Sequence, residues 1–166
     1  VCFGAYDNAD LTSLTLHALE LCEEIECVEV VLGASAPHLR RVREIVKRHS
    51  GWKLHVQPKN VAELMSKADF AIGAAGQMTF ERAVLGLPSL AMAVADNQKP
   101  QMESAAGLGI LRPLPAHRPD VAMLVREIKL LAGNTEARRE MSVKAAHTVD
   151  GKGVQRICKS MFSMTG

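Results

Sequence analysis

Residues 70–94 read FAIGAAGQMTFERAVLGLPSLAMAV and decide the fold. Two short apolar runs, Phe70–Gly73 and Ser89–Val94, enclose a stretch with helical spacing, Gln77–Leu85. Gly86-Leu87-Pro88 ends that helix, because glycine is a favoured C-cap and proline often follows it. The stretch therefore predicts a strand–helix–strand unit, and such units join parallel strands by right-handed crossovers.

The same alternation extends over the first two thirds of the chain. Its apolar runs are apolar throughout more often than alternating, as in strands that are covered on both faces. We expect an α/β fold, a Rossmann-like doubly wound parallel sheet of about six strands, with strands at Val1–Gly4, Val28–Gly33, Trp52–Gln57, Phe70–Gly73, Ser89–Val94 and Ile110–Leu114. If the strand order is 3-2-1-4-5-6, that order reverses between the first strand and the fourth.

Helices are expected between the strands and after the last one. The first carries apolar residues from Leu14 to Ile25, with Asp10 or a neighbour as its cap, and Asn60 is expected to cap a short helix, Val61–Lys67. Beyond Leu114 only helical patterns remain, and we expect these extra C-terminal helices to pack on the flank of the sheet: Val121–Leu131, Glu136–Thr148 and Gly151–Met164.

Composition narrows the class of partner. The 166 residues suit one domain, carry a net charge of +2 and are only 4% aromatic. Nucleic-acid-binding domains usually show a basic excess and stacking aromatics, so we expect no nucleic-acid partner. No apolar stretch approaches the roughly 18–20 residues of a membrane span. The chain opens at Val1 inside an apolar run, which predicts a domain taken from a longer protein.

Cysteine and histidine spacing does not indicate a metal site. The four cysteines show no Cys-x-x-Cys pair, and the six histidines have no ligand partners at metal spacing. We therefore expect neither a metal nor a cofactor. Unpaired cysteines with apolar neighbours suit a reducing compartment, and we expect a cytoplasmic protein.

Two glycine-containing loops are expected at the point where the strand order reverses. Gly4-Ala5-Tyr6-Asp7-Asn8 leaves the first strand, and Gly73–Thr79 leaves the fourth strand and opens a helix. Small residues at a helix start allow backbone N–H groups to approach a phosphate. A tight turn that needs glycine only for steric reasons is an equally good interpretation. Neither loop matches the Gly-x-Gly-x-x-Gly or P-loop patterns.

Polar residues follow at the same edge of the predicted sheet. Glu81 lies one helical turn beyond Gln77 and could accept hydrogen bonds from a ribose diol, or could instead be a solvated helix carboxylate. Asp96-Asn97-Gln98 follows the fifth strand and suits recognition of sugar hydroxyls, although such residues are also common in turns.

These segments resemble one known family. ADFAIGAAGQMTFER (68–82), LGLPS (85–89) and ADNQ (95–98) are similar to segments of PseG-type UDP-sugar hydrolases. The opening FGAYD (3–7) with LTLHAL (14–19), and the ending DGKGVQR (150–156), resemble the same family. The resemblance covers nearly the whole chain and implies the C-terminal half of a GT-B fold.

The resemblance also implies a ligand and a reaction. The family hydrolyses a UDP-linked 2,4-diacetamido-2,4,6-trideoxy-β-L-altropyranose to UDP and the free sugar, on the route to pseudaminic acid. Similarity to MurG-type transferases places Pro58–Val61 at the uracil and Gly76, Gln77, Met78 and Thr79 at the diphosphate. Glu81 would then lie at the ribose, and Gly4, Ala5, Asn97 and Gln98 beside the sugar.

Two further consequences concern the parent protein. In the family, the general acid/base is a histidine of the N-terminal domain, so we expect residues 1–166 to bind UDP while lacking catalytic residues of their own. Ala5, Ala75 and Gln77 depart from the family's glycine and Ser/Thr positions, which leaves the sugar open. The alternatives are the donor-binding domain or subunit of a UDP-sugar glycosyltransferase, and a non-catalytic module that keeps the fold.

Overall fold

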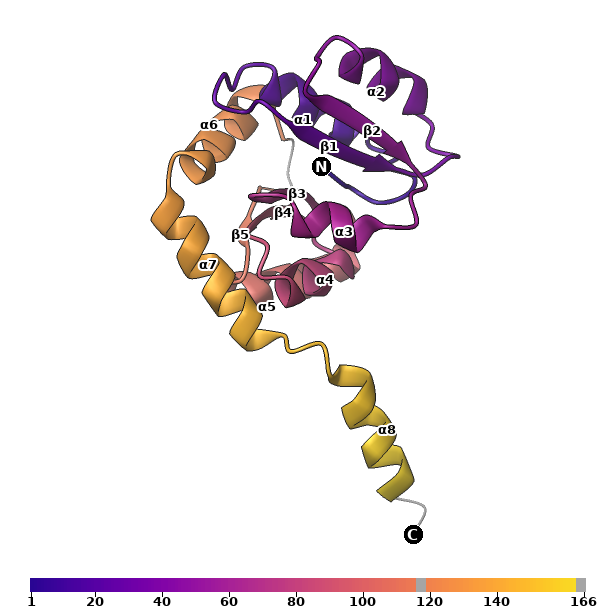
Figure 1. Cartoon of the computed structure of the whole chain (residues 1–166), viewed down its shortest axis with the longest axis vertical. Helices are drawn as coiled ribbons and strands as arrows, with labels where there is room; N and C mark the ends of the chain where they lie inside the picture. Colours follow the sequence, from indigo (N-terminus) through magenta and orange to yellow (C-terminus); the bar gives the residue numbers. More distant parts are fainter. Residues whose placement is uncertain (116–118, 164–166) are drawn as a thin grey trace.

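The computed structural model describes residues 1–115 and 119–163. In this part of the chain, strands and helices alternate as far as β5, and three helices follow (Figure 1). The strands are β1 (Val28–Leu32), β2 (Trp52–Val56), β3 (Ala71–Ala74), β4 (Ser89–Met92) and β5 (Arg112–Pro113). The helices are α1 (Leu11–Leu19), α2 (Leu39–Val46), α3 (Val61–Ser66), α4 (Met78–Val84), α5 (Lys99–Gly107), α6 (Val121–Ala132), α7 (Thr135–Thr148) and α8 (Gly153–Ser163), with a 3-10 turn, η1, at Asp96–Gln98.

All strand pairs are parallel, as predicted. β1 pairs with β2, and β3, β4 and β5 pair in that order. The first residues of the chain join the two groups. Val31 N–H donates to the Val1 carbonyl on one side (2.9 Å), while Cys2 N–H donates to the Ile72 carbonyl on the other (2.9 Å). The spatial order is therefore β2, β1, the N-terminal segment, β3, β4, β5, which confirms the expected order with its reversal next to the N-terminal segment.

The described residues form five regular strands where about six were expected, and Val1–Gly4 adds one isolated bridge, Cys2 to Gly73. Gly4 has a φ of 106°, which turns the chain away before a ladder can extend. The last strand, Arg112–Pro113, is also shorter than the predicted Ile110–Leu114, because Pro113 has no N–H to donate to the ladder. Proline is tolerated in β5 because this strand lies at the edge of the sheet.

Helix boundaries differ from the prediction at two places. The first helix begins directly after Asp10 as expected but ends at Leu19 instead of continuing to Ile25, and the side chain of Asn60 does not cap α3. A helix that the sequence analysis did not predict, α5, follows η1, with Pro100 in its first turn. The helix ahead of Pro88 ends as predicted, with Gly86 at a φ of 62°.

The core lies on both sides of the sheet. One cluster joins β1 and β4 to α1 and α6 through side chains that are fully buried: Leu16, Val30, Leu90 and Ile128. A second, smaller cluster lies beside β4 and includes Met102 of α5 and Ala145 of α7. Since apolar side chains are buried from both faces, β4 is buried along its whole length, as the unbroken apolar run predicts.

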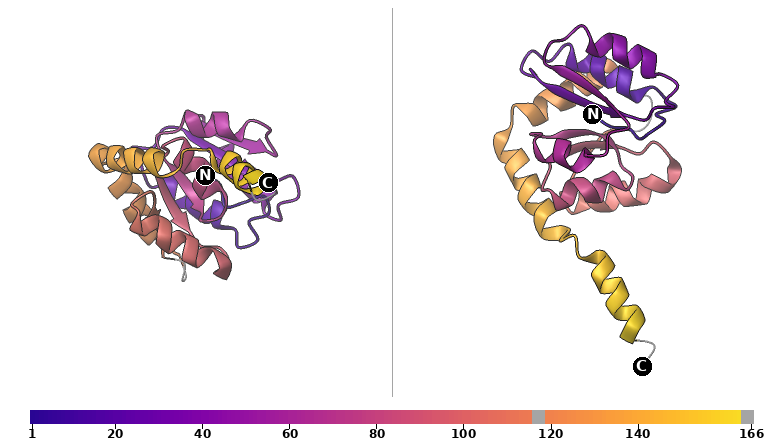
Figure 2. Two further views of the ribbon diagram at one scale, coloured as in Figure 1. Left: turned by 90° about the horizontal axis from the view of Figure 1, so that it is seen from below. Right: turned by 45° about the vertical axis from the view of Figure 1, so that its right-hand side comes forward.

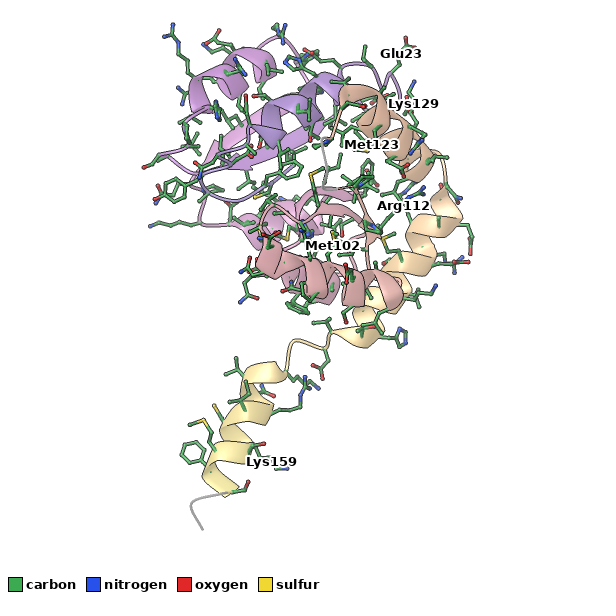
Figure 3. The ribbon with its side chains drawn as sticks, turned by 180° about the vertical axis from the view of Figure 1, so that it is seen from behind. Glu23, Met102, Arg112, Met123, Lys129 and Lys159 are labelled. Atoms are coloured by element: carbon green, nitrogen blue, oxygen red, sulfur yellow. The ribbon has the colours of Figure 1, made fainter. Side chains whose placement is uncertain are left out.

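Two of the three last helices pack on the flank as expected. α6 lies against α1, and α7 lies against α4. Arg112 of β5 forms an ion pair with the buried Glu127 of α6 at 2.8 Å. The third, α8, departs from the prediction, because it projects away from the rest of the chain and buries none of its described side chains (Figures 1 and 2). Figure 3 shows Lys159 on this helix, remote from Met102 and Arg112.

Candidate functional site

The turn between β3 and α4 is the centre of the candidate site. Ala75 N–H donates to the Met92 carbonyl (2.8 Å), which fixes the start of the turn against β4. The next backbone N–H groups, those of Gly76, Gln77 and Met78, have no hydrogen-bond partner among the described residues. Three consecutive free N–H groups at a helix start are suited to bind an anion.

Two glutamines, from η1 and α5, lie beside this turn, and Gln101 holds it by a hydrogen bond. Gln101 Nε2 donates to the Gly76 carbonyl (2.8 Å), and Gln98 Oε1 accepts from Val94 N–H (3.0 Å). A Cβ added at Gly76 would lie 3.1 Å from Gln98 Nε2. A side chain at this position would require the flexible end of Gln98 to shift by a few tenths of an ångström, and the structure brings Gly76 and Gln98 close together.

Arg82 holds the same turn from the inside. Its side chain is buried, and Nη2 donates to the Ala74 carbonyl (2.8 Å) and to Thr79 Oγ1 (3.3 Å). The Thr79 side chain consequently faces the interior, with its hydroxyl already engaged. Any contact of Thr79 with a ligand would have to come from elsewhere than this hydroxyl.

The first loop lies next to this turn, since Ala74 N–H donates to the Cys2 carbonyl (3.1 Å). Gly33 N–H donates to the Ala5 carbonyl (3.0 Å), so Gly4 and Ala5 lie between the ends of β1 and β3. A Cβ at Gly4 would meet nothing within 4 Å, so its glycine is required by its φ and not by crowding.

The start of α1 is already occupied by a side chain. Both carboxylate oxygens of Asp7 accept backbone N–H groups, from Leu11 (3.1 Å) and Thr12 (2.7 Å). Asp10 stands at the N-cap without capping, and its carboxylate pairs with Arg41 at 2.7 Å. An anionic ligand would be repelled here, which leaves the Gly76 turn as the better phosphate site.

The loop predicted to meet a base lies near α4. Pro58 follows β2 and is half-buried. Val61 lines a small cavity of about 60 Å³ together with Met78 and Cys2. The beginning of α3 and the beginning of α4 are therefore adjacent, as binding of one nucleotide by both would require.

The remaining predicted residues are exposed. Gln77, Glu81 and Asn97 lie on the surface, and Glu81 forms no ion pair or hydrogen bond within residues 1–115 and 119–163. Glu81 forms no ion pair with its neighbour Arg82, because the guanidinium of Arg82 turns inward.

Three residues of this region escaped the sequence analysis as site residues. The sequence analysis gave no site role to Arg82, to Gln101 or to the side chain of Asp7. A signal existed for Asp7, since an acidic residue a few positions ahead of an apolar helix favours capping. Nothing local marked the other two, because their partners are backbone carbonyls brought close by the fold.

Other parts of the described chain do not supply a second site of this kind. A cavity of about 410 Å³ lies at the amino ends of the strands, and none of the predicted site residues line it. Among the described residues, no group of histidine, cysteine or acidic side chains could hold a metal ion. No helix in this part of the chain has the length and apolarity to cross a membrane.

Known proteins with the same fold take part in sugar chemistry. The chain is 26% identical over 161 residues to the spore coat polysaccharide biosynthesis protein SpsG of Bacillus subtilis (strain 168), covering 95% of this chain and 47% of SpsG. It superposes on MurG of Acinetobacter baumannii with a TM-score of 0.73 and 17% identity, covering 98% of this chain and 51% of MurG. WaaG, a glycosyltransferase involved in lipopolysaccharide biosynthesis, gives a TM-score of 0.68 and 20% identity, covering 92% of this chain and 42% of WaaG.

These likenesses confirm the fold class, the parallel α/β arrangement of GT-B-like proteins. The chain spans about half the length of the relatives that it matches. Residues 3–144 match the model of a family described as a protein of unknown function, DUF354. Because that match covers most of the chain, the protein belongs to the DUF354 family.

Proposed function

We propose that this chain is the donor-binding half of a GT-B-type enzyme that binds a UDP-linked sugar for polysaccharide biosynthesis. The observation that carries the proposal is the turn at Gly76, whose consecutive free N–H groups lie at the carboxyl end of β3, next to the first loop. Ligands of open parallel sheets bind at this edge, where the strand order reverses.

The ligand would lie across this edge. In the proposal, the diphosphate accepts hydrogen bonds from the N–H groups of Gly76, Gln77 and Met78, with Thr79 fixing the turn from inside. The uracil lies against Pro58 and Val61, and the exposed carboxylate of Glu81 accepts from the ribose. Each of these groups lies on an element whose backbone is held by the sheet. Little conformational freedom is therefore lost when the ligand binds.

The sugar would extend toward the first loop and η1. Gly4 and Ala5 offer an open backbone there, and Asn97 and Gln98 offer amides. Because amides can both donate and accept, they suit hydroxyl and acetamido groups of a sugar. The identity of the sugar depends on side chains beyond the nucleotide half.

A transferase is the reading that the relatives favour. SpsG is named for polysaccharide biosynthesis and WaaG is a glycosyltransferase. A hydrolase of the PseG type is the second reading, and the resemblance of residues 68–98 supports it. Both reactions break the bond between the sugar and UDP, and they differ in whether an acceptor hydroxyl or water attacks carbon one.

The catalytic base would come from another half of the protein. The matched relatives are about twice as long as this chain, so we propose that a second domain covers the site. The exposed apolar side chains of α8, Val154, Ile157 and Met161, are 74%, 62% and 65% accessible and would be covered by that domain. The four free cysteines agree with the cytoplasmic location that we propose.

The test is a titration of residues 1–166 with UDP, CMP and ADP. Binding is measured by calorimetry and by changes in amide chemical shifts. We expect selective binding of UDP, with shifts concentrated at Gly73–Glu81 and Pro58–Val61. Equal binding of all three nucleotides would contradict the uracil assignment. If neither this chain nor its full-length parent binds UDP at millimolar concentration, the proposed function is wrong.

A further inference from the structure

Arg82 is a buried cation without a carboxylate partner. Its residue is 2% exposed, and no acidic side chain of the described residues lies within 4.0 Å of its nitrogens. Burial lowers the pKa of Arg82 to about 10, with the nearby Cys2 and Glu81 partly opposing that shift. The group is still charged at neutral pH, and a buried charge is costly when nothing of opposite sign compensates it.

The guanidinium lies directly under the candidate phosphate turn. Nη2 reaches the last carbonyl of β3, that of Ala74, and the first turn of α4 at Thr79. Nη1 lies beneath Gly73, where an added Cβ would be 3.0 Å away from it. The buried Nε has no hydrogen-bond partner among the described residues. One face of the turn therefore contacts a positive charge.

The same turn also presents donors. The N–H groups of Gly76, Gln77 and Met78 have no partner among the described residues, and the side chain that braces the Gly76 carbonyl, Gln101, is neutral. No carboxylate of the described residues contacts this turn, whereas the start of α1 is neutralised by Asp7. The region thus combines a buried cation with several donors, and the one carboxylate named near it, the exposed Glu81, forms no ion pair with the guanidinium.

We infer that Arg82 supplies the positive charge by which this turn prefers a nucleoside diphosphate to an uncharged nucleoside. The phosphates of the ligand are its missing counter-charge, and they need not touch the guanidinium, because attraction through a poorly screened interior acts over several ångströms. This inference rests on the proposed UDP site. The new element is that the preference for a nucleoside diphosphate over a nucleoside depends on the charge of Arg82, a residue buried from solvent.

Two substitutions of Arg82 separate the effect of its charge on binding from the effect of its packing. Arg82→Gln keeps hydrogen-bonding ability and removes the charge, while Arg82→Lys keeps the charge and loses the planar fork. Gln101→Leu is the matched control, since it removes the brace on the Gly76 carbonyl without changing any charge. Folding of each variant is checked by far-UV circular dichroism and thermal unfolding.

The measurement is the dissociation constant of residues 1–166 for UDP, UMP and uridine, from amide chemical shifts. We expect Arg82→Gln to weaken UDP about tenfold or more and uridine less than about threefold, as loss of one nearby charge implies. Arg82→Lys should keep the preference for UDP over uridine within about threefold of the unchanged protein. Gln101→Leu should weaken both ligands by a similar factor.

The outcomes distinguish this inference from the proposed function. If Arg82→Gln weakens UDP and uridine equally, Arg82 has only a packing role and the inference is wrong. If Arg82→Gln does not fold, Arg82→Lys decides, because loss of the UDP preference with the charge retained would overturn the inference. Absence of UDP binding in the unchanged chain and in its full-length parent would remove the proposed site itself.

Discussion

Glu81 lies at the surface of α4, one helical turn after Gln77, and binds no other described residue. A carboxylate that serves no packing role is free to accept hydrogen bonds from a ribose. We expect Glu81→Ala to weaken UDP by about 1–3 kcal/mol, the range for hydrogen bonds to charged groups. Calorimetric titration measures this change.

The control for Glu81 is Glu140→Ala, an exposed carboxylate on α7. It carries the same charge and lies outside the proposed site, so UDP affinity should not change. An unchanged affinity in Glu81→Ala would remove Glu81 from the site, while an equal loss in both variants would show that the effect is not specific to the site, because removal of a negative charge alone favours binding of the anionic UDP.

Gly73 lies where three parts of the structure meet. A Cβ there would lie 2.0 Å from the Cys2 carbonyl and 3.0 Å from Arg82 Nη1, so backbone must move to admit it. We expect Gly73→Ala to lower the free energy of unfolding by about 2 kcal/mol or more, as overpacking of a rigid core does. Urea unfolding followed by circular dichroism measures the loss.

Gly107→Ala is the matched control for Gly73. A Cβ at Gly107, the last residue of α5, would meet nothing within 4 Å. Alanine there should leave stability unchanged or raise it by up to about 1 kcal/mol, because alanine favours the helix. Equal destabilisation by both substitutions would contradict the contact at Gly73.

At the scale of elements, Glu20 joins α1 to the region around the end of α2. His17 (2.9 Å) and His49 (3.0 Å) hydrogen-bond to its carboxylate, and Arg48 pairs with it at 3.0 Å. Burial alone would raise the pKa of Glu20, but these hydrogen bonds and the charge of Arg48 outweigh it and lower the pKa below 4.5. The ionised carboxylate is therefore the form that the folded state favours.

The direction of the pH effect follows from that lowered pKa. A carboxyl whose pKa is lower in the folded state stabilises the fold above its unfolded pKa, and this contribution is lost as pH falls through the folded value. We expect Glu20→Gln to lose stability at pH 7 and to approach the unchanged protein below about pH 4. Urea unfolding at both pH values tests this, and an equal loss at both would contradict it.

α8 contributes little to the stability of the rest of the chain. None of its described side chains is buried, and it projects beyond the end of α7 (Figure 2, right). We expect a chain ending at residue 149 to unfold within about 3 °C of residues 1–166, since little apolar area is lost from the core. Differential scanning calorimetry checks this, and a drop beyond about 6 °C would show that α8 packs on the domain in solution.

At the scale of the whole molecule, the candidate site is an open edge. Donor groups lie on one side of the proposed ligand, and the described residues supply no closed cleft at this edge. Exclusion of water and a positioned acid or base are needed for sugar transfer or hydrolysis. We expect residues 1–166 to bind UDP weakly and to release no measurable UDP from a UDP-sugar, as a coupled assay for UDP would show.

The proposed longer enzyme, of which this chain would be one half, provides the comparison. A full-length protein with its second half should release UDP from its sugar donor, and a histidine in that half should be essential. Measurable UDP release by residues 1–166 alone would contradict the division of binding and catalysis between two halves. An acceptor-dependent release would favour the transferase over the hydrolase.

The sequence by itself determined the strand–helix alternation, the parallel direction of the strands and the position of the Gly76 turn. These features depend on residues that are neighbours in the chain. Apolar runs set the buried strands, and Gly86 with Pro88 ended α4, because backbone preference and local periodicity act over a few residues.

The tertiary structure decided the features that depend on distant residues. Three features need contacts across the fold. They are the single strand bridge of the N-terminal segment, the hydrogen bond from Gln101 to Gly76, and the burial of Arg82 under the turn. An arginine in a helix reads as a surface residue, since burial of a charge is costly. Only the packing of α4 against β3 shows that this charge lies inside, and local sequence preferences contain no information about that contact.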